Sequence, residues 1–199
     1  MKKKVFAVSV LVLCLAILAT GTAAYFTARD TAHNVITTGN VDIAVVEKQE
    51  KDGELTDYPR GPITGALPGS VVSKIVSVKN TGTGDAWVRV RADKTITLDP
   101  DAPEALPTGN APDVSLLKLN IDTTHWVDGG DGWYYCRKAL PAGSTTETLF
   151  TTVTFDKDMG NAYQGCTAEI EIKAEAVQSK NNPLPAGGDY SKIPGWPSK

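Results

Sequence analysis

Apolar and polar residues alternate with a period of two along several short segments of the chain. In the clearest of them, residues 167–177, one set of alternate positions is apolar and the other is polar or charged from Thr167 to Glu175. Successive side chains of a β-strand point to opposite faces, so this pattern predicts strands that pack on one face and meet water on the other. The pattern is found at 41–45, 86–93, 149–155 and 167–177, and in a less regular form at 71–79 and 114–121.

Clusters of glycine, proline and aspartate separate the predicted strands. Residues 128–132 (Asp-Gly-Gly-Asp-Gly) lie between two aromatic segments and predict a β-hairpin over 124–138. Glycine accepts the positive φ of a tight turn, and aspartate hydrogen-bonds to its own backbone there. Further breaks at 58–69, 80–84 and 99–112 leave about seven or eight short strands. We therefore predict an all-β fold, a single β-sandwich of jelly-roll or Greek-key type.

The first residues have the three parts of a bacterial-type signal peptide. Three lysines follow Met1, residues 5–19 carry no charge, and residues 20–24 are small. The apolar part has about fifteen residues, fewer than the roughly 20 that a permanent membrane-spanning helix needs. We predict a secreted or surface-associated mature chain, and an uncleaved N-terminal anchor is the alternative. The residues at the predicted cleavage site are Ala23, Ala24 and Tyr25.

Beyond residues 1–24, the chain divides into one domain and a tail. Residues 25–180 contain all the predicted strands and are numerous enough for the core of one domain. Residues 181–199 are rich in proline and glycine, and we expect an extended or disordered end there. Loss of the three lysines with residues 1–24 changes the formal net charge from −3 to about −6. This acidic balance argues against nucleic acid as a partner, because phosphate binding needs a basic surface.

Two cysteines remain once Cys14 has left with the signal peptide. Cys136 and Cys166 would then lie outside the cytoplasm, where disulfides persist, and we expect them to form one. The bridge would close a loop of about 30 residues and contribute roughly 3 kcal/mol by lowering the entropy of the unfolded chain. Two buried free thiols are the alternative.

The sequence contains no recognisable catalytic or metal-binding motif, and we predict no cofactor. Its two histidines, His33 and His125, are about 90 residues apart, whereas the helical zinc-protease motif places them four positions apart. Asp128 and Asp131 could ligate calcium, but we prefer a role in the turn. The aromatic residues at 126 and 133–135 could stack a sugar or a peptide, and here we prefer packing within the hairpin.

Several short blocks of the chain are more specific than its composition. They are residues 21–27, 34–38, 39–43, 67–70, 76–82 and 86–90. In these blocks the chain resembles the TasA/camelysin family of exported Gram-positive proteins, which a SipW-type signal peptidase processes. Residues 131–177 look like related clostridial exported proteins that have the same type of signal.

This resemblance implies a jelly-roll fold, secretion or loose surface association and, in the TasA branch, assembly into biofilm matrix fibres. The expected function is a secreted structural protein, a subunit of extracellular fibres or surface matrix that binds copies of itself head to tail. The camelysin branch implies a secreted metalloendopeptidase as the alternative, and a monomeric surface binding module is a third. The loop at 98–113, the two mature cysteines and the Pro-rich tail depart from the TasA type.

The segment after the cleavage site is the candidate assembly element. Its aromatic and β-branched residues include Tyr25, Phe26, Val35 and Ile36, which suit an edge strand. Such a strand can pair with the sheet of its own chain. It can also pair with the sheet edge of a neighbour, in a contact that does not close and therefore propagates. The sequence leaves both outcomes open, and cleavage would release the segment for either.

We expect the secreted protein to begin at Ala24 or Tyr25, because the small residues after the apolar run are those that a signal peptidase accepts. Intact-mass measurement or N-terminal sequencing of the protein from culture medium checks this. Recovery of the full-length chain alone, in the membrane fraction, would contradict it.

Overall fold

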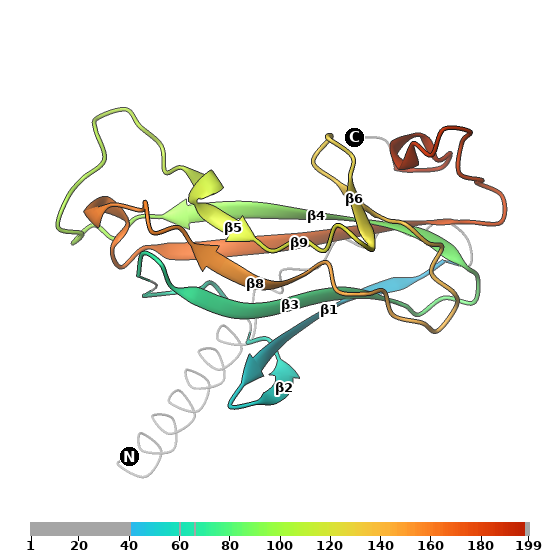
Figure 1. Ribbon diagram of the computed structural model, residues 1–199, viewed down its shortest axis with the longest axis horizontal. Coiled ribbons are helices and arrows are strands. Elements are labelled where there is room, and N and C mark those ends of the chain that lie inside the picture. The colour runs from blue at the N-terminus through green and yellow to red at the C-terminus, as the bar shows by residue number, and fades with distance from the viewer. Residues whose placement is uncertain (1–40, 60, 66, 198–199) are drawn as a thin grey trace, which may run out of the picture. The chain divides into compact units, whose positions relative to one another are not determined.

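Two antiparallel β-sheets make up most of the regular structure (Figure 1). The computed structural model describes residues 41–59, 61–65 and 67–197. Within these ranges the strands are β1 (Ile43–Lys51), β2 (Glu54–Asp57), β3 (Val71–Asn80), β4 (Ala86–Thr97), β5 (Leu117–Leu119), β6 (Trp126–Asp128), β7 (Tyr134–Cys136), β8 (Phe150–Phe155) and β9 (Thr167–Gln178). Short 3₁₀ helices lie at Val114–Leu116, Asn161–Tyr163 and Tyr190–Lys192. None of the helices in the described ranges is long and apolar enough to cross a membrane.

The chain passes repeatedly from one sheet to the other. Counted over the described residues, one sheet has the order β2-β1-β3-β8-β5 and the other the order β6-β7-β4-β9. Every pairing of these strands is antiparallel. The two layers confirm the all-β sandwich that the alternation of residues predicts. The choice between a jelly roll and another Greek-key arrangement stays a prediction.

The longest pairing joins β4 to β9. It runs without a register shift from Ala86 opposite Gln178 to Thr97 opposite Thr167. The inner positions of β9 are buried, as the alternation in residues 167–177 predicts. At the end of β9 the outer position Val177 is buried as well. That part of the outer face is therefore covered, which the sequence pattern did not predict.

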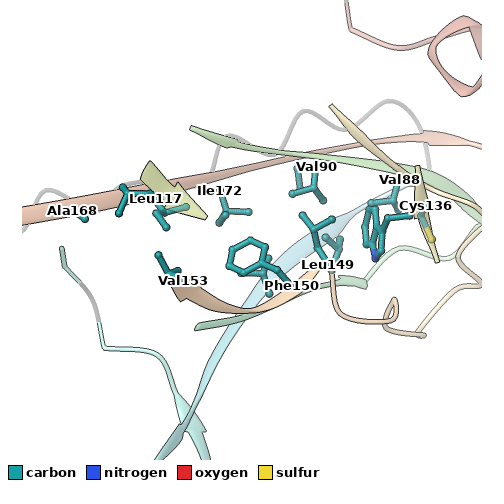
Figure 2. Close-up of a cluster of buried hydrophobic side chains, with 14 of the residues drawn as sticks. Val88, Val90, Leu117, Cys136, Leu149, Phe150, Val153, Ala168 and Ile172 are labelled. Atoms are coloured by element: carbon teal, nitrogen blue, oxygen red, sulfur yellow. The ribbon is translucent and has the colours of Figure 1, made fainter. Parts of the chain in front are cut away.

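The core lies between the two sheets (Figure 2). Side chains of β4 and β9 face side chains from β8 and from the residue just before it. Each of the labelled valine, leucine, isoleucine and phenylalanine side chains in these segments is at most 1% exposed. Burying a side chain of this size contributes about 1.5–3 kcal/mol to folding. The residues labelled in this part of the figure are Val88, Val90, Ile172, Leu149, Phe150 and Val153.

The predicted hairpin at 124–138 is confirmed as the pair β6–β7. Its turn is closed by a hydrogen bond of 2.9 Å from the Gly129 amide to the carbonyl oxygen of Trp133. A Cβ atom at Gly129 would lie 2.5 Å from Cε2 of Tyr135, so any larger residue would displace that ring. The glycine is therefore required by close packing.

Strand β1 changes its partners along its length. It pairs with β3 from Ile43 to Lys48 and with β2 from Lys48 to Lys51. The β1–β2 hairpin points away from the two layers in Figure 1, and all of β2 is exposed. Asp52 and Gly53 have φ values of 55° and 83°, the left-handed conformation that a two-residue type I′ turn needs. The sequence pattern did not predict β2.

Replacement of Phe150 by alanine should destabilise the protein by about 3–5 kcal/mol, because it leaves a cavity between the sheets. Urea unfolding followed by circular dichroism measures this. Leu55→Ala on the exposed face of β2 is the matched control and should change stability by less than about 0.5 kcal/mol. Equal effects of the two substitutions would contradict the position of the core.

Candidate functional site

A cluster of aromatic and charged side chains lies on the outer face of the four-stranded sheet. Residues of β4, of the β6–β7 hairpin and of the C-terminal tail form it. We call it the aromatic cluster and define it as Trp87, Arg89, Trp133, Tyr135, Tyr190 and Trp196.

The strand alternation explains why these side chains meet. Val88 and Val90 point into the core, so Trp87 and Arg89 point outward from β4. Arg89 lies opposite Tyr135 of β7 on one side and opposite Glu175 of β9 on the other. A single position on the central strand therefore brings a cation, a phenol and a carboxylate together.

Arg89 is a buried cation whose charge is matched on several sides. Its Nε and Nη2 donate to Oε2 of Glu175 at 2.8 and 2.5 Å. Its Cζ lies 4.3 Å from the centre of the Trp133 ring and 4.7 Å from that of Trp196. The side chains of Arg89 and Glu175 are only 6% and 13% exposed. Cation–π contacts and ion pairs are stronger when water is excluded, so this geometry holds the tail against the sheet.

Tyr135 connects this ion pair to the hairpin turn. Its hydroxyl donates to Oδ2 of Asp131 at 2.8 Å and accepts a 3.4 Å hydrogen bond from Nη1 of Arg89. Burial raises the pKa of Tyr135 to about 12, since the lowering by Arg89 does not offset burial and the nearby Asp131 carboxylate. Within the described ranges, the buried Nε1 of Trp133 has no hydrogen-bond partner.

The C-terminal tail packs against the sheet, which corrects the prediction of an extended or disordered end. Ile193 is 3% exposed, and the Trp196 ring contacts that of Tyr135 at 5.8 Å between centres. Nε1 of Trp87 donates to the carbonyl oxygen of Asn182 at 2.8 Å, and the Tyr190 hydroxyl donates to that of Arg137 at 3.0 Å. The sequence interpretation weighed the prolines and glycines of the tail and did not weigh Tyr190, Ile193 and Trp196.

The predicted disulfide is wrong, because Cys136 and Cys166 are free and buried. Cys136 adjoins the start of β4 and Cys166 adjoins its end, as the registers of β7 and β9 require. About ten residues of strand, or about 33 Å, separate these positions. A disulfide needs Cα atoms within about 7 Å of each other. In Figure 2, Cys136 and Ala168, which is two residues from Cys166, lie at opposite ends of the core cluster.

The structure does not test the residues predicted for signal cleavage and for assembly. Ala23, Ala24, Tyr25, Phe26, Val35 and Ile36 all lie outside the described residues.

The hairpin residues have structural roles. Oδ1 of Asp128 accepts a hydrogen bond of 2.8 Å from the Gly130 amide, and Oδ1 of Asp131 accepts one of 3.1 Å from the Trp133 amide. Both aspartates therefore act in the turn, as preferred from the sequence. Trp126 is completely buried, so it offers no face for stacking a ligand.

His125 and Asp122, an imidazole beside a carboxylate, are hydrogen-bonded to each other within one loop. Nδ1 of His125 lies 2.6 Å from Oδ2 of Asp122, and the hydrogen bond from His125 lowers the pKa of the Asp122 carboxyl. The other oxygen of Asp122 accepts from the Thr124 amide at 2.8 Å. In the described part of the chain, no group of three His, Cys, Asp or Glu residues is placed to hold a metal ion.

The remaining charges beside the aromatic cluster are paired with one another. Asp93 accepts from Lys173 at 2.8 Å and from Arg91 at 3.2 Å. Partial burial raises the pKa of Asp93, but these hydrogen bonds and charges more than offset that effect and hold it below its ordinary value. The arrangement suits recognition of a peptide segment by aromatic and ionic contacts, and its described groups include no activated nucleophile.

Comparison of the chain with models of known protein families, with curated proteins and with solved structures finds no match. The resemblance to the TasA/camelysin family therefore stays a prediction from the residues quoted above.

Glu175→Gln should destabilise the protein by about 3 kcal/mol, because it removes the anion from a buried, hydrogen-bonded cation while keeping the shape of the side chain. Denaturant unfolding measures the change. Glu171→Gln on the same strand is the matched control, since its pair with Lys173 is 38% exposed on the glutamate side and should contribute less than about 1 kcal/mol. Similar losses in the two variants would contradict the role assigned to Arg89.

Proposed function

We propose that this protein is a secreted structural protein, a subunit of extracellular fibres or surface matrix that assembles through its mature N-terminal segment. In this proposal, residues 25–38 add as a strand to the sheet of a neighbouring copy once a SipW-type peptidase has removed the signal peptide. The sequence resemblance motivates the proposal, and the edge of one sheet supports it.

The supporting observation is the position of β9. It stands last in the order of the four-stranded sheet within the described residues, and it is the longest strand there together with β4. On the side away from β4, Ile63 and Ala168 exchange two backbone hydrogen bonds of 2.8 Å. This edge therefore accepts strand pairing, which is what strand addition requires.

The start of the described chain packs in the same core as β9. Val41 is 1% exposed and belongs to the core cluster, and the strand that follows it, β1, contacts β9. Val41, where the described chain begins, therefore packs in the core that β9 helps to form. A segment such as 25–38 spans at most about 50 Å when extended, and a strand of twelve residues such as β9 is about 40 Å long, so the lengths are compatible.

The direction of assembly follows from this geometry. If the segment of one copy pairs with β9 of the next, the two contacting surfaces differ. The first copy still has a free β9 edge, and the second still has a free donor segment. Such a heterologous contact propagates into a filament unless it closes into a ring. Pairing of the segment with β9 of its own chain would instead give a monomer.

A chain that begins at Asn40 should stay monomeric, whereas a chain that begins at Tyr25 should polymerise, because only the second has the donor segment. Light scattering and negative-stain electron microscopy of the two purified proteins compare them.

A chain that begins at Tyr25 and has Val35→Pro is the matched control. It keeps the length of the segment but loses a backbone donor in the middle of the strand, and it should remain monomeric. If the chain beginning at Tyr25 remains monomeric over a range of pH and concentration, donor-strand assembly is wrong.

A further inference from the structure

The docked part of the tail has a regular pattern. Tyr190, Ile193 and Trp196 are spaced three residues apart, and all three contact the outer face of the sheet or lie buried against it. The Tyr190 ring contacts the Trp87 ring edge-on, with 6.1 Å between ring centres. The centre of the Trp196 ring lies 4.7 Å from Cζ of Arg89. Nη2 of Arg89 also donates to the carbonyl oxygen of Pro197 at 3.3 Å. The sheet thus recognises a short peptide through two aromatic rings, one aliphatic side chain and one carbonyl.

The surface that receives this peptide belongs to the folded sheet and not to the tail. Trp133 and Tyr135 are fixed by the β6–β7 hairpin, and Arg89 is fixed by Glu175 of β9. We call this surface the groove and define it as Trp87, Arg89, Trp133, Tyr135 and Glu175. Trp133 belongs to this surface, and among the described residues its buried Nε1 has no hydrogen-bond partner.

The linker between β9 and the docked peptide does not determine which groove the peptide enters. Between residues 183 and 188, the Gly188 amide donates a local hydrogen bond of 3.0 Å to the carbonyl oxygen of Pro185. Gly187 and Gly188 have φ values of 102° and 75°, which glycine adopts without strain. Asn182 is held by Trp87, and the roughly eight residues from there to Tyr190 reach about 27 Å when extended, enough to reach a molecule in direct contact with this one.

We propose that the groove is a peptide-docking site that also takes the Tyr190–Pro197 segment of a second copy of this chain. The second copy offers the same residues, so exchange replaces each contact with an identical one. Within one chain the tether gives the segment an effective concentration in the millimolar range, so self-docking dominates in dilute solution. Exchange becomes important where copies are crowded together. This contact uses the opposite end of the chain from residues 25–38 and does not depend on them.

A labelled peptide of residues 186–199 provides the test, with the full chain as receptor. The chain's own segment must first be released, which Ile193→Asp combined with Trp196→Ala does by removing its buried aliphatic anchor and the half-buried ring that contacts Arg89 and Tyr135. Fluorescence anisotropy should show that the peptide binds this open chain at least tenfold more tightly than the unmodified chain, whose groove is occupied. The same peptide with Trp196→Ala should bind the open chain at least tenfold more weakly.

A second variant with a released tail keeps the test valid if the first variant misfolds. Gly195 has φ of 88°, and a Cβ atom there would lie 3.3 Å from Oδ1 of Asn182, so Gly195→Val should release the tail without altering any aromatic side chain. Leu55→Ala, far from the tail in sequence and exposed, should leave peptide binding unchanged. Thermal melts followed by circular dichroism establish that each variant is folded.

Occupation by a second copy has its own readout. Sedimentation of the double-variant open chain mixed with labelled unmodified chain should reveal a heterodimer that excess free peptide dissociates. The proposal is overturned if neither open chain binds the peptide better than the unmodified chain does, or if no heterodimer forms at millimolar concentration. Neither signal requires fibres, so a failure here is distinct from a failure of donor-strand assembly.

Discussion

The pairing of β4 with β9 is the constraint on which the rest of the structure depends. Its uninterrupted register places valines and alanines on one face and Arg89 opposite Glu175 on the other. The inner face supplies half of the core, and the outer face supplies the anchor for the hairpin and the tail. A slip by one residue would exchange the two faces and bury charges in the core, so the hydrophobic pattern and the ion pair fix the same register.

A buried arginine would ordinarily weaken a small domain, because its desolvation is costly. Here Arg89 is only 5% exposed, and its guanidinium contacts two tryptophan rings. The ring faces supply negative potential where the carboxylate does not reach. The outer face of the sheet therefore behaves as a second, smaller core, built from aromatic rings and one matched charge instead of aliphatic side chains.

The sequence predicted those elements whose burial depends on local alternation, and it missed those that depend on a distant partner. Residues 167–177 alternate because every inner position meets the opposite sheet, so the strand was predictable. β2 contains one apolar residue, Leu55, and forms because the turn at Asp52 and Gly53 returns the chain to β1. The cysteines were misassigned because spacing along the chain does not reveal position along β4. The tail was missed because the groove that orders it comes from three strands.

The register of the central pair also affects when the domain can fold. Ala86 pairs with Gln178, about 90 residues later in the chain, so β4 has no complete partner until nearly the whole polypeptide has been made. Closing so long a loop before any contact forms is slow, and this delay is typical of non-local β topologies. Until then, the inner faces of strands β1 and β3 lack the sheet that packs against them. The sandwich is therefore completed from its C-terminal side, once β9 has been made.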